Sequence, residues 1–220
     1  MAGSLQAAFM NQRSFGPPPP GAIGSAYEGG FYAGQISTTG DGVATHYLIV
    51  APVSGGQNNS KQVKTTDTTT SGTTSNIDGP TNSANMNNAN HPAAQFCEGL
   101  TLGGYTDWYL PAKNELEVCY YNLKPTTNNN NTSSGANTNA VPSRGSNYTA
   151  GTPAKTAAAN FDDDLSGVQR FEAGVQRYWS STEVTGDPGN AWYQLFSNGQ
   201  QGDNSKTVSY YVRAVRRVAV

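Results

Sequence analysis

Two short amphipathic helices that follow each other directly, with strands on both sides, constrain the fold of this chain most strongly. In the first, Pro92 suits the opening turn, and apolar side chains recur at helical spacing at Ala93, Phe96, Cys97 and Leu100. In the second, Pro111 opens the helix, Pro125 closes it, and the same spacing returns at Leu116, Cys119, Tyr120 and Leu123. Two helices without a strand between them do not fit the alternating pattern of a parallel α/β sheet.

Stretches with strand character lie before and after the helical pair. The sequence predicts strands within residues 29–37 and 45–53, the second containing a continuous apolar run, and again within 177–183, 190–199 and 209–218. In the last strand one face carries Tyr210, Val212, Ala214 and Val218, and the other carries Tyr211, Arg213, Val215 and Arg217. Residues 54–90 and 126–174 are rich in Thr, Ser, Asn and Gly and are predicted loops. The expected fold class is α+β.

The N-terminal residues form a separate unit. Residues 4–15 carry Leu5, Phe9, Met10 and Phe15, and the following GPPPPG is typical of a stiff, extended spacer. Such a tail either stays disordered or docks on another chain; we expect docking. We therefore divide the chain into an anchoring peptide with a Pro-rich linker at 1–26 and one domain at 27–220. We expect no secretory signal and no membrane insertion, because neither a basic n-region nor an apolar run of about 20 residues is present.

Charge and composition exclude some partners. Only 13% of the residues are charged and the formal net charge is −2, which argues against nucleic-acid binding. Arg213, Arg216 and Arg217 cluster in one strand, where pairing with carboxylates is the expected role. Twelve Tyr and three Trp accompany abundant neutral polar residues, a composition typical of loop-based binding surfaces.

No pattern indicates a catalytic or metal site, and no cofactor is expected. His46 and His91 lack ligands at metal spacing, and Asp162–Asp164 lacks the alternating loop of a calcium site, so a solvated acidic turn is the better interpretation. Ser180 and Ser181 adjoin Glu183 without a nucleophile turn or a nearby histidine. Structural hydrogen bonds or ion pairs are expected for four acids in regular segments, Asp107, Glu115, Glu117 and Glu183. The cysteines, Cys97 and Cys119, are predicted to be free thiols in the core, with a disulfide as the alternative.

The stretch 190–207, NAWYQLFSNGQQGDNSKT, places large aromatic residues beside small hydrogen-bonding ones. A strand that runs into a turn explains this pattern simply, but a recognition surface with rigid aromatic area and adaptable polar groups explains it as well. We expect Trp192 and Phe196 to anchor the strand inward and Tyr193 to face outward.

Several motifs together resemble a known family. GGYTDWYLPAKNELEVCYYNL, YWSSTE, AWYQLFSNG and YYVRAVRRV follow one another as they do in C-type-lectin-fold domains at the ends of phage tail fibres. These domains include relatives of the major tropism determinant and other targets of diversity-generating retroelements. The likeness covers Gly29 to Val220 and implies a C-type-lectin-like fold with two helices, a small antiparallel sheet and long loops. The calcium motif of sugar-binding lectins is missing from TGDPGN at 185–190, and the late cysteines of formylglycine-generating enzymes are missing too.

The resemblance implies a framework at Trp179–Glu183 and Val212–Arg216 and a displayed segment at 184–209 between them. The expected ligand-binding residues are Asp187, Asn190, Tyr193, Ser197, Asn198, Gln200, Gln201, Asp203 and Asn204. The expected function is non-enzymatic: a receptor-binding protein at the tip of a phage tail fibre, located on the virion. Its partners would be a host cell-surface receptor (protein or glycan), other tail proteins through residues 1–20, and further copies of itself, as in a homotrimer.

Two alternatives stay open at this point. One is a structural decoration or assembly domain that binds another phage protein. The other, which the sequence favours least, is an enzyme acting on surface polysaccharide, which would need facing carboxylates about 5 to 9.5 Å apart.

Overall fold

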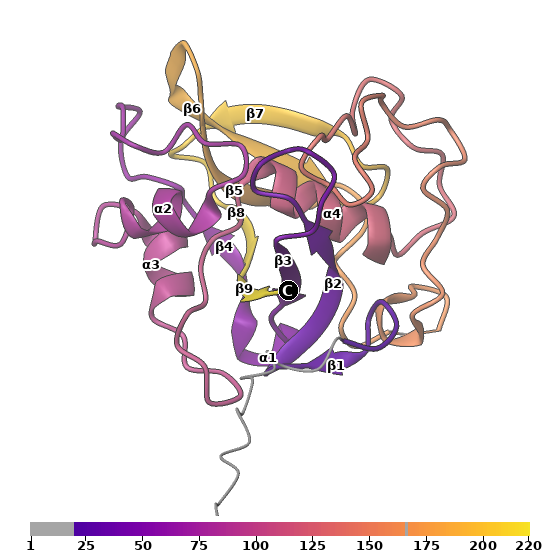
Figure 1. Cartoon of the computed structure of the whole chain (residues 1–220). Coiled ribbons are helices and arrows are strands. Elements are labelled where there is room, and N and C mark those ends of the chain that lie inside the picture. Colours follow the sequence, from indigo (N-terminus) through magenta and orange to yellow (C-terminus); the bar gives the residue numbers. More distant parts are fainter. Residues whose placement is uncertain (1–19, 166) are drawn as a thin grey trace, which may run out of the picture.

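The computed structural model describes residues 20–165 and 167–220, and these form a mixed α+β arrangement with two sheets (Figure 1). The first sheet has four strands in the order β1-β2-β3-β9, with bounds Ala26–Tyr27, Gly30–Ile36, His46–Val50 and Val215–Ala219. The second has five strands in the order β4-β8-β5-β6-β7, with bounds Gln57–Lys61, Tyr210–Arg213, Arg177–Val184, Asp187–Leu195 and Gln201–Ser205. Strands β5 and β8 pair in parallel, and the other neighbours pair antiparallel.

Both predicted helices are confirmed, as α3 (Pro92–Glu98) and α4 (Lys113–Leu123). A proline lies in the first turn of α3, and Glu115 accepts a hydrogen bond from the Ala112 N–H at 2.8 Å at the start of α4. Two shorter helices, α1 (Val53–Gly56) and α2 (Gly79–Ala84), lie in the segment predicted as loop, as does strand β4. A 3₁₀ turn, η1 (Ala159–Phe161), interrupts the second long loop region. No helix among the described residues is long and apolar enough to cross a membrane.

The predicted C-terminal strand is divided in two. Ala214 separates β8 from β9: its N–H donates to the Gly56 carbonyl at 3.0 Å and its carbonyl accepts from the Ala51 N–H at 2.9 Å. The chain thereby passes from one sheet to the other. The predicted facing of its side chains is confirmed, because Val212, Ala214 and Val218 belong to one apolar core while Val215 belongs to another.

The two cores fix where the irregular segments lie. The first packs α4 against both sheets and contains Tyr120, Tyr178, Phe171 and Phe196; the second lies on the α3 side and contains Cys97, Trp108, Trp179 and Tyr193. In Figure 1, α2 and α3 lie together on one side of the molecule and the loops after α4 on the other. Cys97 and Cys119 are free and buried, as predicted. The division of the chain at residue 26 stays a prediction, and residues 1–19 lie outside the described residues.

Candidate ligand-binding surface

The hairpin of β6 and β7 holds most of the residues predicted to bind a ligand. Its register pairs Asn190 with Ser205, Trp192 with Asp203 and Gln194 with Gln201. Because side chains alternate across a strand, these residues share one face of the sheet. Gln194, at the inner end of this face, is buried, whereas Asn190 and Trp192 are half-buried and Asp203 is exposed. The outer end of the face is therefore open to solvent.

Trp192 is covered on one side by Lys113, the first residue of α4. The Lys113 Nζ lies 3.5 Å from the centroid of the indole ring, a cation–π contact. The backbone of Lys113 is fixed too, since its N–H donates to Thr182 Oγ1 of β5 at 3.0 Å. Burial lowers the pKa of the Lys113 ammonium. The start of α4 therefore contacts the hairpin through a cation on a partly exposed tryptophan. No sequence pattern indicated this role for Lys113.

Asn190 joins two exposed aspartates beside this tryptophan. Its Nδ2 donates to Asp187 Oδ2 and to Asp203 Oδ2, both at 2.9 Å. The amide orients both carboxylates without neutralising them. We call Lys113, Asp187, Asn190, Trp192 and Asp203 the Trp192 surface; it combines one aromatic ring, one cation, two anions and one amide.

The expected orientation of the two aromatic residues in β6 is wrong. Tyr193 is only 8% exposed and packs edge-on against Trp179 and Tyr210, with ring centroids 6.3 and 5.7 Å apart. Trp192 points to the opposite face and is partly exposed. Tyr193 is the register partner of the buried Trp179 in β5, so it lies on the same, buried face, and Trp192 lies on the other. Phe196 is an anchor, as predicted: it stacks on Phe171 at a centroid distance of 3.8 Å.

The turn between β6 and β7 is held by the loop that follows α4. Thr126 Oγ1 donates to the Ser197 carbonyl at 2.8 Å, and the Asn131 N–H donates to the Asn198 carbonyl at 2.8 Å. The Gln201 N–H donates to Ser134 Oγ at 3.0 Å. The predicted ligand-binding residues of this turn, Ser197, Asn198, Gln200 and Gln201, are half-buried as a result. Asn204 is likewise engaged, since its Nδ2 donates to the Tyr210 hydroxyl at 2.6 Å.

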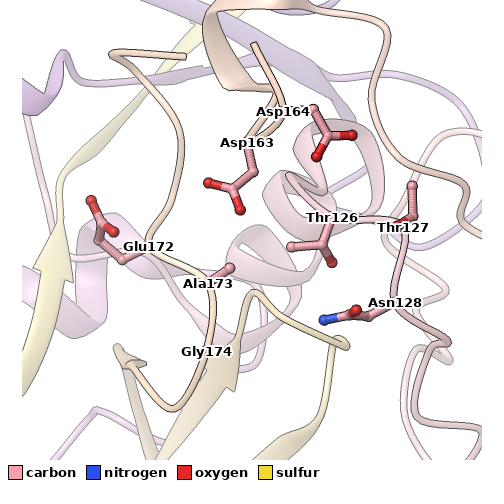
Figure 2. A pocket seen from close by; sticks show the side chains of 8 residues that line it. All are labelled: Thr126, Thr127, Asn128, Asp163, Asp164, Glu172, Ala173 and Gly174. Atoms are coloured by element: carbon pink, nitrogen blue, oxygen red, sulfur yellow. The ribbon is translucent and has the colours of Figure 1, made fainter. Parts of the chain in front are cut away.

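An acidic hollow of about 390 Å³ adjoins the same turn (Figure 2). Figure 2 shows the carboxylates of Asp163, Asp164 and Glu172 spread around a rim that Thr126 and Asn128 complete. Two of these carboxylates have cationic partners: Arg170 Nε lies 2.9 Å from Asp163 Oδ1, and Lys155 Nζ lies 2.6 Å from Asp164 Oδ2. Within the described residues, no three His, Cys, Asp or Glu side chains are placed to hold a metal ion.

The remaining candidate residues discussed for catalysis or metal binding are buried, apart from the half-buried His46. Glu115 accepts from Arg217 Nε at 2.7 Å, and Glu117 accepts from the Tyr148 hydroxyl at 2.7 Å and from Asn137 Nδ2 at 2.6 Å. His91 lies between Thr70 Oγ1 and Asn88 Oδ1, each at 2.9 Å. The other histidine, His46, contacts Thr45 Oγ1 through Nδ1 at 2.9 Å. Ser180 and Ser181 are each 1% exposed.

The arginine cluster is paired only in part as predicted. Arg216 binds Asp107 with two hydrogen bonds of 2.7 and 2.9 Å, and Arg217 pairs with Glu115. Arg213 instead donates to backbone carbonyls, those of Ala51 at 2.9 Å and Gln169 at 2.7 Å. It therefore ties the segment beside the acidic hollow to the sheets.

Taken together, the described residues form a mixed α+β domain that exposes one end of a hairpin face between long loops. The model of the Lcl C-terminal domain family matches residues 57–216, most of the chain. The chain therefore belongs to the Lcl C-terminal domain family. No curated protein matches it.

The identification as a domain of phage tail fibres is wrong, because the matching family is a different one. The motifs that suggested it, Trp179–Glu183 and Val212–Arg216, are buried framework strands. Such motifs indicate how the strands pack, and they do not indicate in which kind of protein the domain occurs. The virion location and the tail-protein partners were expected only because of that resemblance, and neither is proposed below.

Proposed function

We propose that this domain is a non-enzymatic binding module that recognises an external ligand, a protein or a glycan, through the segment 184–209. The observation that carries the proposal is the Trp192 surface. Trp192 offers partly exposed aromatic area, Asp203 lies opposite it in the register of the hairpin, and Asn190 orients both aspartates. Rigid aromatic area beside preoriented polar groups favours recognition at a modest entropic cost.

The finer fold that we propose is C-type-lectin-like. Its support is the placement of two packed helices against two small sheets, with long loops that frame one hairpin. In that arrangement the loop of residues 126–135 braces the β6–β7 turn through three hydrogen bonds to backbone atoms, and the Trp192 surface is left as the open part of the segment.

The ligand that fits best carries both an apolar face and hydrogen-bonding or cationic groups, because two aspartates flank the tryptophan. Nucleic acid is not a proposed partner, since the formal net charge is −2 and the exposed acids of the surface would repel phosphates. Binding at one such surface is expected to be weak, and a homo-oligomer would compensate by avidity. No cofactor and no catalytic residue are part of the proposal.

The test is binding of the labelled full chain to a panel of immobilised glycans and extracellular proteins. The variant Asn190→Ala/Asp203→Ala should lose at least tenfold in affinity for every ligand that the wild type binds. Gln95→Ala, on the exposed side of α3, is the matched control and should bind like the wild type. If the hairpin variant binds as well as the control, recognition does not use this surface. If the wild type binds nothing on the panel, a structural or assembly role takes precedence.

A further inference from the structure

Two adjoining hollows on the outer side of α4 share Tyr121 as a common wall. One, of about 320 Å³, is also lined by Arg144, Tyr148 and Thr149. The other, of about 330 Å³, is also lined by Ala22, Ile23 and Ala158. We call the two together the Tyr121 groove; it lies apart from the Trp192 surface and contains none of its residues.

The walls of the groove combine tyrosine, alanine and isoleucine side chains with neutral polar ones, and its two cations are paired with carboxylates. The Arg144 guanidinium lies 3.7 Å from the centroid of the Tyr121 ring and forms an ion pair with Glu117, whose side chain is fully buried. In the second hollow, Lys155 is paired with Asp162 at 3.1 Å and with Asp164 at 2.6 Å. A groove whose charges are already paired and whose wall includes the half-buried Tyr121 ring suits an apolar occupant better than a free ion.

The chain enters the described part beside the groove, and its preceding sequence has the composition of such an occupant. Ala22 and Ile23 line one hollow and follow closely on Pro20, the first described residue. Before them the sequence carries four large apolar side chains, Leu5, Phe9, Met10 and Phe15. Phe15 precedes Ala22 by seven residues, so their Cα atoms lie at most about 25 Å apart. The apolar side chains are thus within reach of both hollows.

Charge also fits this occupant. Arg13 is the single charged side chain among residues 1–19. The Asp164 carboxylate beside the second hollow is 71% exposed, although it is paired with Lys155, and it can accept a further cation. A segment with one arginine and several apolar residues therefore suits the walls of the groove and the acidic side chain that pairs with its Lys155.

We propose that residues 4–15 bind in the Tyr121 groove of the same chain, with their apolar side chains in the two hollows. These residues lie outside the described part of the chain, and the inference rests on the groove, on the place where the chain enters it and on the sequence that precedes it. The groove is then an internal docking surface. This inference is independent of the proposed ligand recognition.

The test is a cysteine cross-link in the full chain under mild oxidation at low protein concentration. Ser14→Cys is combined with Thr149→Cys in the groove or, as the control, with Thr185→Cys, which is equally exposed and lies beyond β5. The native Cys97 and Cys119 are buried and do not compete. The groove pair should form an intrachain disulfide at least ten times faster than the control pair. Adding Phe9→Ala and Phe15→Ala should remove that advantage, whereas adding Gln6→Ala and Gln12→Ala should keep it.

Three results would overturn the proposal. Equal rates for the groove and control pairs would mean that the segment does not seat there. A fast groove cross-link that persists without Phe9 and Phe15 would mean proximity without apolar docking. A cross-link formed mainly between chains would place the segment on another copy.

Discussion

Lys206 and Glu183 form an ion pair inside the protein, with side chains 1% and 5% exposed. Glu183 lies near the end of β5, and Lys206 directly follows the edge strand β7, so the pair joins β5 to the end of β7 across the intervening β6. Glu183 also accepts the Thr70 N–H at 2.7 Å, and Lys206 Nζ donates to the Thr68 carbonyl at 3.1 Å. Burial lowers the pKa of Lys206, and its hydrogen bond to Glu183 opposes that shift. The network fixes the loop near residue 70 against the end of β7.

Removing one partner of this ion pair should destabilise the domain strongly. Lys206→Met leaves the Glu183 carboxylate buried without its cation and is expected to cost about 3–5 kcal/mol of unfolding free energy. The double variant Lys206→Met/Glu183→Gln should cost less than the single Lys206→Met, because no uncompensated charge remains. Urea denaturation of the three proteins measures this. A double variant that is less stable than Lys206→Met would refute the role given to the pair.

Because the pKa values of both histidines are lowered in the folded protein, we predict that the free energy of unfolding decreases at mildly acidic pH. Burial, with the Lys64 and Lys206 ammonium groups, lowers the pKa of His91, and burial with Arg217 lowers the pKa of His46. The unfolded chain therefore takes up protons at a higher pH than the folded one. The stabilisation from neutral histidine is present above about pH 6.5 and is lost as the pH falls below that value.

The measurement is the free energy of unfolding at pH 7.5 and pH 5.5 for the wild type and His91→Gln. Glutamine can keep hydrogen bonds to Thr70 and Asn88 but does not titrate, so the decrease at pH 5.5 should be smaller in the variant. Raised pKa values of the buried Glu115 and Glu117 act in the opposite direction in both proteins and cancel in the comparison. An equal decrease in both proteins would exclude His91 as a cause.

Both cysteine thiols should be unreactive in the folded protein. Burial raises the pKa of Cys97 and of Cys119 far above the usual range, and each side chain is 0% exposed. The thiolate is the reactive form, so neither thiol should react with a disulfide reagent at pH 8 while the chain is folded. In denaturant both should react at once. A cysteine that reacts with the native protein as fast as with the unfolded chain would show that its part of the core is open.

Alanine substitutions at two glycines beside the hairpin should lower the free energy of unfolding by different amounts. Gly199, in the β6–β7 turn, has φ +74° and a Cβ there would lie 2.3 Å from the Tyr120 ring. Gly186, in the β5–β6 turn, has φ +86°, but a Cβ there meets nothing within 4 Å. Gly186→Ala should cost about 1–2 kcal/mol for the backbone conformation alone. Gly199→Ala adds overpacking and should cost about 1–3 kcal/mol more. Thermal unfolding measures the stability of both variants. Equal losses would mean that the Tyr120 ring moves aside without an energetic cost.

The sequence predicted the elements whose side chains divide clearly into apolar and polar faces. Helices α3 and α4 follow from that pattern, and the predicted strands β2, β3, β5 and β6 from runs rich in apolar and aromatic residues. Strands β4, QNNSK, and β7, QGDNS, do not, because they form the two edges of the five-stranded sheet and contribute backbone hydrogen bonds instead of apolar side chains. Edge strands made of Asn, Gln, Ser and Gly have the composition of loops.

The sequence singled out the segment 184–209 but not the side-chain geometry that the structure gives it. Within this segment the half-buried ring is that of Trp192, and the buried ring is that of Tyr193, the reverse of the expectation. The contact of Lys113 with Trp192 joins residues far apart in the sequence, and so does the bracing of Ser197 by Thr126. Such contacts depend on how α4 and its following loop pack on the hairpin, which no local pattern encodes.

Fluorescence of Trp192 during ligand binding tests the central claim most directly. Trp108 and Trp179 are 0% exposed, so the difference between the wild type and Trp192→Phe isolates the one partly exposed tryptophan. A ligand identified on the panel should shift the emission assigned to Trp192 and reduce its quenching by acrylamide. In a titration, the midpoint of this change should equal the dissociation constant. Saturating binding that leaves both the emission and the quenching of Trp192 unchanged would contradict recognition through this surface.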